Sequence, residues 1–268
     1  MPEGHTIHRY ARLHTKTFAG QQLRAWSPQG RFDDGAALLD GTVLEGVDAR
    51  GKHLFYRWEH DRTLHVHLGL FGRFRTHRGD SPPDPSDGTR LALRSDDATV
   101  YLSGPTDCSL IDPDEEAEIL DRLGPDPIAD GAEGIDRFAE MLGRRTVGIG
   151  QALLDQKAVA GVGNVYRAEA LFLEGVHPEV RARDLDDDAV GALWDRLVDL
   201  LVAGERAGRI VTVDPDEVGA SSTRDLDRSE RLYVYKRAGE PCRRCGTEIQ
   251  RWEMGNRSIW ACPACQPR

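Results

Sequence analysis

Four cysteines in the last 27 residues have the spacing of a metal site. They are Cys242, Cys245, Cys262 and Cys265, arranged as Cys-x2-Cys-x16-Cys-x2-Cys. Each pair places two thiolates on one tight turn, and two facing turns make a tetrahedral four-sulfur site, the geometry that zinc prefers. A tail of this size cannot bury a core alone, so the metal would supply its stability. Because four thiolates leave no open coordination position, the spacing predicts one structural zinc ion and no metal catalysis.

The segment 161–166, Gly-Val-Gly-Asn-Val-Tyr, is a second candidate site. It lies between two apolar segments with helical spacing. The glycines permit a tight turn with free backbone N–H groups, and the N-terminus of the next helix would attract an anion such as phosphate. Asn164 is well suited to cap that helix. A turn that serves only to pack two helices is the alternative interpretation.

The chain start, Met-Pro-Glu, offers a nucleophile. Methionine before proline is normally removed, which would expose Pro2 as a secondary amine. An α-amine titrates near ~8, so more of it is neutral at pH 7 than of a lysine side chain. A neutral secondary amine can attack a sugar C1′ atom and form an iminium, and Glu3 lies beside it to handle protons. A Met-Pro start without any chemical role is the alternative.

The charge of the chain is unevenly distributed. The net charge of −10 and the pI of about 5.4 argue, taken alone, against a nucleic-acid-binding protein. The segment Arg228–Arg268, however, holds nine Arg and Lys residues against four Glu. Between its cysteine pairs lie Arg251, Arg257, Trp252 and Trp260, a combination that suits contact with phosphates or a groove. A solvated surface is the alternative, but the net charge does not exclude a basic face.

The first half of the chain has the pattern of a β-sandwich or barrel with a helix beside it. A helix is expected over residues 2–16, with Pro2 and Glu3 in its first turn. From about residue 20 to 110, short β-rich runs alternate with Gly, Pro and Asp. The expected strands are Thr42–Val47, Leu54–Trp58, Leu64–Leu70 and Thr99–Leu102. The lone Cys108 in this region is expected to be a buried structural residue.

The second half of the chain is expected to be helical. Residues 123–130 are rich in helix breakers and resemble a domain linker. Helical spacing follows at Ile135–Leu142, Ile149–Gln156, Val165–Glu174 and Ala189–Ala203, and the polar stretch 210–230 is expected to be a mobile loop. These patterns predict an α+β protein with a sandwich domain at 1–122, a linker at 123–130, a helical domain at 131–230 and the cysteine-bearing tail at 231–268.

Composition favours a soluble globular protein. The chain has 268 residues, of which 39% are hydrophobic and 30% charged. No run approaches the roughly 18 apolar residues of a membrane span, and the first residues lack the basic start and apolar run of a secretory signal. A cytoplasmic monomer with no membrane partner is therefore expected.

Taken together and in order, these motifs resemble the formamidopyrimidine-DNA glycosylase / endonuclease VIII family. The resemblance covers nearly the whole chain. It is carried by Pro2-Glu3, Gly51-Lys52, residues 67–72 (His-Leu-Gly-Leu-Phe-Gly), 123–127, 154–157, 161–166, His177-Pro178, 239–246 and the ending from Arg257 to Gln266.

The resemblance implies a β-sandwich, a helix–two-turns–helix domain and a zinc finger. It implies that Pro2 is the nucleophile, that Glu3 protonates the opening deoxyribose ring, and that Lys52 contacts phosphate and assists catalysis. His67, Asn164 and Arg257 match phosphate-gripping positions of the family. Leu70 matches the wedge that fills the gap left by an extruded nucleotide, although an ordinary core position in a strand is the alternative.

The resemblance further implies a bifunctional DNA glycosylase and AP lyase of base excision repair that acts on damaged DNA. Many members that recognise oxidised purines begin Pro-Glu-Leu-Pro-Glu, whereas residues 2–8 here are Pro-Glu-Gly-His-Thr-Ile-His, as in the endonuclease VIII branch. Oxidised pyrimidines are therefore the expected substrates, with cleavage by β,δ-elimination. Oxidised purines, a non-catalytic DNA-binding zinc-finger protein and a small-molecule enzyme with a structural zinc finger are the alternatives. The loop that covers the extruded base is expected within residues 210–230.

Overall fold

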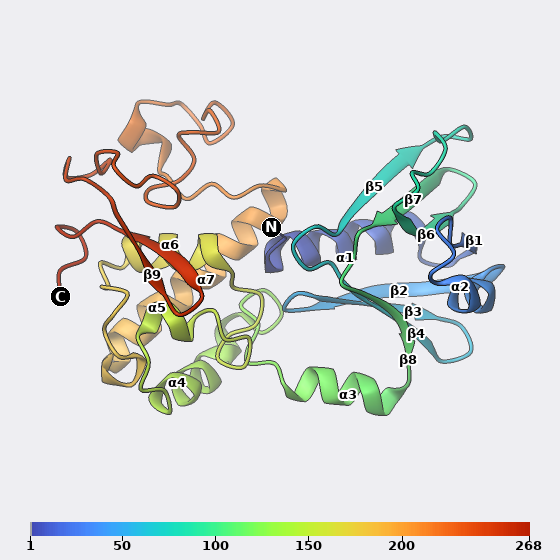
Figure 1. The fold of residues 1–268 in the computed structure, drawn as a ribbon, viewed down its shortest axis with the longest axis horizontal. Helices are drawn as coiled ribbons and strands as arrows, with labels where there is room; N and C mark the ends of the chain where they lie inside the picture. Colours follow the sequence, from blue (N-terminus) through green and yellow to red (C-terminus); the bar gives the residue numbers. More distant parts are fainter. Residues whose placement is uncertain (1) are drawn as a thin grey trace. The chain divides into compact units, whose positions relative to one another are not determined.

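The computed structural model describes residues 2–268, and the chain divides into two compact units, Met1–Asp121 and Arg122–Arg268 (Figure 1). The first unit contains an antiparallel sheet with helices, and the second is mainly helical with a small hairpin near its end. The expected α+β class is therefore confirmed, with the β-rich part first and the helical part second.

The first unit is a β-sandwich. Its elements are α1 (Gly4–Phe18), β1 (Gln21–Trp26), α2 (Asp33–Leu39), β2 (Thr42–Arg50), β3 (His53–Trp58), β4 (Arg62–His67), β5 (Arg73–Arg78), β6 (Thr89–Arg94), β7 (Ala98–Ser103), β8 (Asp107–Ile111) and α3 (Pro113–Asp121). The strand order is β5-β7-β6-β1-β2-β3-β4-β8. Residues 21–23 of β1 pair with β2, and residues 24–26 pair with β6. The sheet therefore folds over at β1 into two layers, one with β2, β3 and β4 and the other with β5, β6 and β7 (Figure 1).

The helix α1 packs on the sandwich through one apolar face. Ile7, Ala11, His14 and Phe18 are buried, and their spacing of three and four residues puts them on one side of the helix. The expected start of this helix at residue 2 is wrong, because the helix begins at Gly4. Glu3 has an extended backbone (φ −118°, ψ 176°) and is the N-cap, so Pro2 and Glu3 precede the first turn.

One expected strand is shorter than its hydrophobic pattern indicated. The run Leu64–Leu70 was expected to be a single strand, but β4 ends at His67. Leu68 turns into the core, and its carbonyl oxygen accepts a hydrogen bond from the N–H of Gly72 at 2.9 Å. Gly69 adopts a left-handed φ of +62°, which favours glycine and redirects the chain. The turn therefore lifts the following residues out of the sheet.

The sequence analysis did not predict the strand β5, because the composition of this strand is polar. Of its six residues, Arg-Phe-Arg-Thr-His-Arg, only Phe74 is buried. The strand lies at the edge of the sheet, so most of its side chains face solvent and no apolar alternation develops. Its pairing with β7 is a long-range property that local composition does not report.

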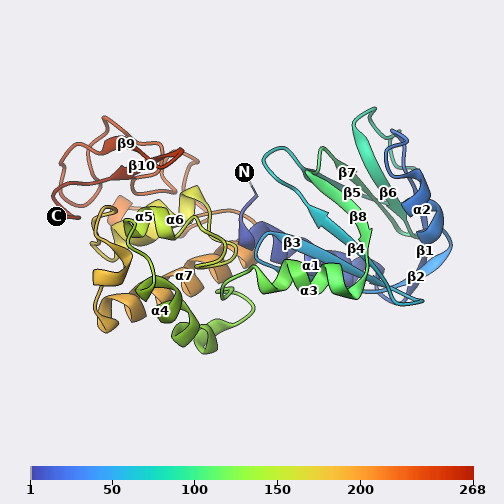
Figure 2. The same ribbon diagram turned by 60° about the horizontal axis from the view of Figure 1, so that its bottom comes forward.

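The second unit is a helical assembly that carries the cysteine-bearing tail. Its elements are η1 (Gly131–Gly134), α4 (Ile135–Gly143), α5 (Ile149–Ala152), α6 (Asn164–Leu173), η2 (Ala182–Asp184), α7 (Asp187–Ala207), η3 (Pro215–Val218), β9 (Gln250–Met254) and β10 (Arg257–Ala261). Phe138, Tyr166, Leu171 and Trp194 belong to the core among the helices. A separate core lies between α6 and the tail, with Phe172 packed beside Ile259 and Trp260. Figure 2 shows β9 and β10 beside α5 and α6.

The segment 123–130, expected as a linker, is packed into the second unit over most of its length. Residues 123–127 are buried. The N–H of Gly124 donates to the carbonyl oxygen of Gln156, and the carbonyl oxygen of Pro125 accepts from the N–H of Ala160. A Cβ atom at Gly124 would lie 2.7 Å from the backbone of residue 158, so this close approach requires glycine. The glycine and proline residues of this segment therefore let the chain pack closely against the backbone of the second unit.

The helix α5 is shorter than expected. It ends at Ala152, whereas helical spacing continued to Gln156. The side chain of Gln156 donates to the carbonyl oxygen of Val162 and accepts from the N–H of Gly161, both at 3.1 Å. These bonds fix the return of the chain toward α6, so the residues after Ala152 form turns instead of helix. No helix within residues 2–268 has the length and apolar character needed to cross a membrane.

Candidate functional site

The N-terminal residues lie at the entrance to α1. Pro2 is half-buried, and the Glu3 side chain is fully buried. The carbonyl oxygen of Glu3 accepts from the N–H of Thr6 at 2.8 Å, which starts the helix behind it. A carboxylate is favoured at a helix N-terminus because of the aligned peptide dipoles. Burial lowers the pKa of the neighbouring His5 to about 4. Met1 lies outside the described residues.

Lys52 and His67 come together at one end of the first unit. Lys52 lies in the turn between β2 and β3, where Gly51 has a φ of +59°. His67 is the last residue of β4 and pairs with His53, the residue after Lys52. Burial lowers the pKa of His67, and the nearby His65 and the Lys52 ammonium lower it further. The imidazole of His67 is therefore favoured in its neutral form.

Two apolar side chains project from the turn that follows β4. Leu70 is 47% exposed and Phe71 is 82% exposed. The turn beneath them is fixed by the hydrogen bond between Gly72 and Leu68 and by the buried side chain of Leu68. Leu70 is thus on the surface, which removes the alternative that it is an ordinary core residue. The sequence analysis did not predict Phe71 as a site residue. Its position next to Leu70 was the signal that could have identified it.

Asn164 does not cap its helix in the expected way. The N-cap of α6 is Gly163, and no side-chain capping hydrogen bond forms there. Asn164 is instead the first helical residue and is 8% exposed. Its Oδ1 accepts from Nη2 of Arg167 at 2.5 Å, and its Nδ2 donates to the carbonyl oxygen of Ser258 at 3.3 Å. Of the two glycines in the preceding turn, only Gly161 has a left-handed φ, at +86°.

Arg167 is a buried residue that sequence analysis missed. Its Nη2 donates to Asn164 and to the carbonyl oxygen of Ser258 at 2.7 Å, and its Nη1 donates to the carbonyl oxygen of Gly150 at 2.9 Å. A planar guanidinium suits several fixed acceptors at once. Ser258 follows Arg257, which is exposed at the start of β10. The guanidinium of Arg167 therefore holds both Asn164 and the strand β10, which begins at Arg257.

Glu169 anchors the chain that leads into the cysteine-bearing tail. Its side chain is fully buried and accepts from the backbone N–H groups of Tyr233, Val234 and Tyr235 at 2.8, 2.9 and 2.8 Å. It also accepts from the hydroxyl of Thr212. A buried carboxylate is stable only when its oxygens are satisfied in this way. Glu169 thus fixes residues 233–235, at the start of the tail, against α6. Arg167, two residues earlier on α6, bonds Ser258 in β10 near the end of the tail.

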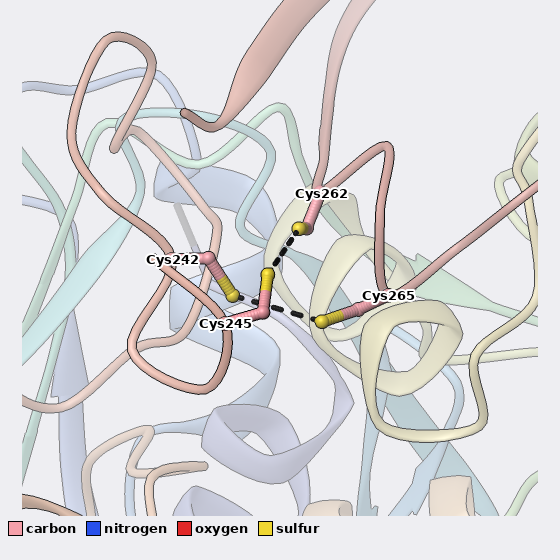
Figure 3. A group of neighbouring side chains, drawn as sticks. All are labelled: Cys242, Cys245, Cys262 and Cys265. Carbon is pink, nitrogen blue, oxygen red and sulfur yellow. Dashed lines mark hydrogen bonds between the residues drawn. The ribbon is translucent and has the colours of Figure 1, made fainter. Parts of the chain in front are cut away.

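The four cysteines converge as their spacing predicts. Their sulfur atoms all lie within 4.8 Å of one another, and Figure 3 shows the four side chains pointing toward a common centre (Figure 3). The distance between Cys242 and Cys265 is 3.8 Å, and that between Cys245 and Cys262 is 3.4 Å. A tetrahedral zinc site with Zn–S bonds of about 2.3 Å requires sulfur atoms about 3.8 Å apart. The donor set and its spacing therefore fit zinc, and the distances are too long for disulfides.

Cys108 does not belong to this cluster. It lies in β8 with 7% exposure and packs in the core of the sandwich. Burial raises the pKa of its thiol to about 12. The interpretation of Cys108 as a buried structural residue is confirmed by this position.

Three protein-family descriptions match successive parts of the chain. Residues 1–107 match the formamidopyrimidine-DNA glycosylase N-terminal domain. Residues 123–214 match the formamidopyrimidine-DNA glycosylase H2TH domain, and residues 239–268 match the zinc finger found in FPG and IleRS. The matched segments follow the sandwich, the helical part and the cysteine-bearing tail in order.

Whole-chain relatives agree with these matches. Endonuclease 8 1 of Mycobacterium tuberculosis is 41% identical over 269 residues, covering 99% of this chain and 100% of the relative. The formamidopyrimidine-DNA glycosylase of Herpetosiphon aurantiacus is 34% identical, covering 86% of this chain and 84% of that protein. The Lactococcus lactis Fpg, solved in complex with DNA that contains an abasic site, has a TM-score of 0.80 and 27% identity, covering 99% of this chain and 100% of that one.

Proposed function

The chain belongs to the formamidopyrimidine-DNA glycosylase and endonuclease VIII family, and on this premise we propose that it removes oxidised pyrimidines and cleaves the strand by β,δ-elimination. Members of this family are DNA glycosylases of base excision repair with AP lyase activity, and the chain is such an enzyme. The preference for pyrimidines is supported by the N-terminal run Pro-Glu-Gly-His and by the 41% identity to an endonuclease 8.

The chemistry proposed for the N-terminus begins with the amine of Pro2. Once Met1 is removed, the nitrogen of Pro2 attacks C1′ of the damaged nucleoside and the bond from C1′ to the base breaks. The proton that the nitrogen loses goes to the departing base. Glu3 donates a proton to the ring oxygen as the sugar opens, which leaves an iminium between Pro2 and C1′. Loss of the C2′ proton then expels the 3′ phosphate, and a second elimination expels the 5′ phosphate. The observation that carries this proposal is the placement of Pro2 ahead of the helix with the buried carboxyl of Glu3 next to it.

The other site residues are proposed to hold the DNA. Lys52 and His67 in the first unit, and Asn164 and Arg257 in the second, would contact phosphates and fix the register of the backbone. Leu70 would enter the base stack and fill the space left by the extruded nucleotide, which offsets part of the unstacking cost. Phe71, exposed beside it, would add an aromatic surface for stacking. We assign a structural role to one zinc ion held by Cys242, Cys245, Cys262 and Cys265.

A panel of duplex oligonucleotides tests the function directly. Each would carry one oxidised pyrimidine, 8-oxoguanine or an abasic site, and borohydride would be added during the reaction. We expect a covalent protein–DNA adduct with the abasic site and the oxidised pyrimidine, and at least tenfold less with 8-oxoguanine. A reversed preference would support an oxidised-purine enzyme instead. DNA binding without any adduct would support a non-catalytic binding protein.

Arg167 offers a test of the proposed phosphate site in the second unit. Arg167→Lys keeps the charge, but an ammonium cannot bond Gly150, Asn164 and Ser258 with the planar geometry of a guanidinium. We expect DNA affinity to fall about tenfold, which corresponds to about 1.4 kcal/mol. Fluorescence anisotropy with an uncleavable abasic-site analogue measures the change.

The matched control for this variant is Arg237→Lys. Arg237 is also buried and donates to backbone carbonyl oxygens, those of Tyr233 and Pro241, but it bonds neither Asn164 nor Ser258. Its replacement is expected to change affinity less than twofold. Equal affinity losses in the two variants, measured where both remain folded by thermal melting, would contradict the positioning role of Arg167.

A further inference from the structure

Lys236 has a backbone conformation that is unfavourable for its residue type. Its φ is +61°, in the left-handed region where a Cβ atom crowds the following carbonyl oxygen. Among residues 2–268, the other non-glycine residues in this region are His60 and Asp61, which form the hairpin turn between β3 and β4, where positive φ values are usual. Lys236 lies instead in a turn of the cysteine-bearing tail and is exposed. Backbone strain of this kind is typical of functional sites.

The turn that contains Lys236 is fixed by its neighbours. The N–H of Arg237 donates to the carbonyl oxygen of Val234 at 3.1 Å, which makes Tyr235 and Lys236 the central residues of a β-turn. A positive φ at the second central residue is typical of a type II turn, which favours glycine or asparagine there. Glu169 holds the backbone N–H groups of residues 233–235, so the chain enters the turn along a fixed path. The fold therefore imposes the left-handed conformation, and lysine is not the residue that suits it best.

The side chain of Lys236 lies over an aromatic pair. Its Nζ atom is 5.6 Å from the centroid of the Tyr235 ring, within the range of a cation–π contact. That ring meets Trp260 of β10 edge to face, with centroids 4.7 Å apart and planes at 65°. Arg251 lies over the other ring of the pair, with its Cζ atom 5.9 Å from the centroid of Trp260. The ammonium is thus held against the hairpin that contains β10, the strand that begins at Arg257.

The charge of this ammonium is available to a ligand. Two glutamates of the tail are paired with other cations, Glu240 with Arg237 at 2.8 Å and Glu253 with Arg251 at 3.2 Å. Within residues 2–268, Lys236 forms no ion pair. The tail as a whole has an excess of positive charge. Because the aromatic ring already restrains the ammonium, binding of an anion costs less conformational freedom than it does for a fully extended lysine.

We propose that Lys236 binds a phosphate of the DNA backbone, as a contact of the second unit in addition to those of Asn164 and Arg257. The proposal deepens the proposed function and rests on it. Each phosphate that a lysine neutralises releases condensed counterions, which favours binding and offsets the strain of the turn. A phosphate contact carries no information on the bases, so Lys236 would raise the affinity for damaged and undamaged duplexes alike.

Lys236→Gly distinguishes a binding role from a structural one. The substitution removes the charge, and it also removes the strain, because glycine adopts a φ of +61° without a steric penalty. We expect the midpoint of thermal unfolding to equal that of wild type or to rise by about 2 °C, while DNA affinity falls. A lower midpoint would mean that the lysine side chain stabilises the turn, and it would overturn the proposal.

The salt dependence of binding tests the phosphate contact itself. Fluorescence anisotropy would measure the affinity for a duplex with an uncleavable abasic-site analogue and for the undamaged duplex, at several salt concentrations. We expect Lys236→Gly and Lys236→Gln to lower both affinities about fivefold and to make the slope of log affinity against log salt shallower by about 1. Lys236→Arg keeps the charge and is expected to recover most of the affinity. Lys16→Gln removes an exposed lysine from the last turn of α1 and, as the matched control, is expected to change neither quantity.

The outcomes separate the two proposals. If the wild-type protein binds and cleaves abasic-site DNA but the variants of Lys236 match Lys16→Gln in affinity and salt slope, the role of Lys236 is wrong while the proposed function stands. If the wild-type protein neither binds nor cleaves abasic-site DNA, the proposed function fails, and the role of Lys236 fails with it. A loss confined to the abasic-site duplex would also overturn the phosphate contact, because a contact with the backbone alone affects both duplexes.

Discussion

Protein that retains Met1 should lose strand cleavage almost completely, and removal of Met1 from the same sample should restore it. In the retained form the nitrogen of Pro2 is part of a peptide bond, so its lone pair is delocalised and cannot attack C1′. Loss of the nucleophile from a covalent mechanism costs on the order of 10³-fold or more in rate. The remaining groups, including Glu3, Lys52 and the cysteine-bearing tail, are the same in both forms.

The experiment compares one preparation before and after enzymatic processing. Protein is produced with methionine aminopeptidase inhibited, and half is then treated with that enzyme, with the N-terminus checked by mass spectrometry. We expect borohydride adducts and cleavage products only in the treated half, and affinities for an uncleavable abasic-site analogue within a few-fold of each other. Equal rates in the two halves would show that another group is the nucleophile. A large loss of affinity in the untreated half would mean that Met1 obstructs DNA binding instead.

The features predictable from sequence were those fixed by local spacing. The four cysteines lie on two short turns, so the spacing between the cysteines largely determines how their sulfur atoms are arranged. The strands β2, β3 and β7 carry apolar runs because one or both faces are buried. The N-terminal helix was recognisable for the same reason, although its start was misplaced because the extended backbone of Glu3 leaves no mark in the periodicity.

The features that sequence reasoning missed depend on contacts between distant residues. Arg167 and Ser258 are 91 positions apart, and Glu169 bonds residues 64 to 66 positions away. An arginine or glutamate in an amphipathic helix is expected at the surface, because these residues are rarely buried unless they are paired. Its burial becomes predictable only when its partners are known. The turn that carries Leu70 was missed for a different reason. Leu68 and Leu70 continue the alternation of β4, and only the left-handed Gly69 between them shows that the strand has ended.

Removing zinc should unfold the cysteine-bearing tail and leave the β-sandwich intact. Structural zinc contributes about 10–16 kcal/mol in small zinc-finger peptides, far more than a short hairpin can gain from its own core. The apolar contacts of β10 with α6, including Ile259 and Phe172, would not offset that loss. We therefore expect hydrogen exchange of β9 and β10 to rise by orders of magnitude on chelation, while exchange in the strands of residues 21–111 stays within a few-fold.

Unfolding of the tail should also abolish tight DNA binding. The carbonyl oxygen of Ser258 is a shared acceptor for Arg167 and Asn164, so loss of β10 releases Asn164 as well as Arg257. Two proposed phosphate contacts in the second unit would thus be lost together, and we expect affinity for an abasic-site analogue to fall at least a hundredfold.

Cysteine variants with matched chemistry make this test specific to the metal. Cys262→Ser removes a ligand and should lower the zinc content from one ion per chain to near zero, with the same rise in exchange. Cys108→Ser removes the remaining cysteine of the chain, which is buried in the other unit, and should leave the zinc content at one. The zinc assignment would be wrong if Cys262→Ser retained the metal. The coupling to DNA binding would be wrong if the metal-free protein kept both the slow exchange of β10 and its affinity.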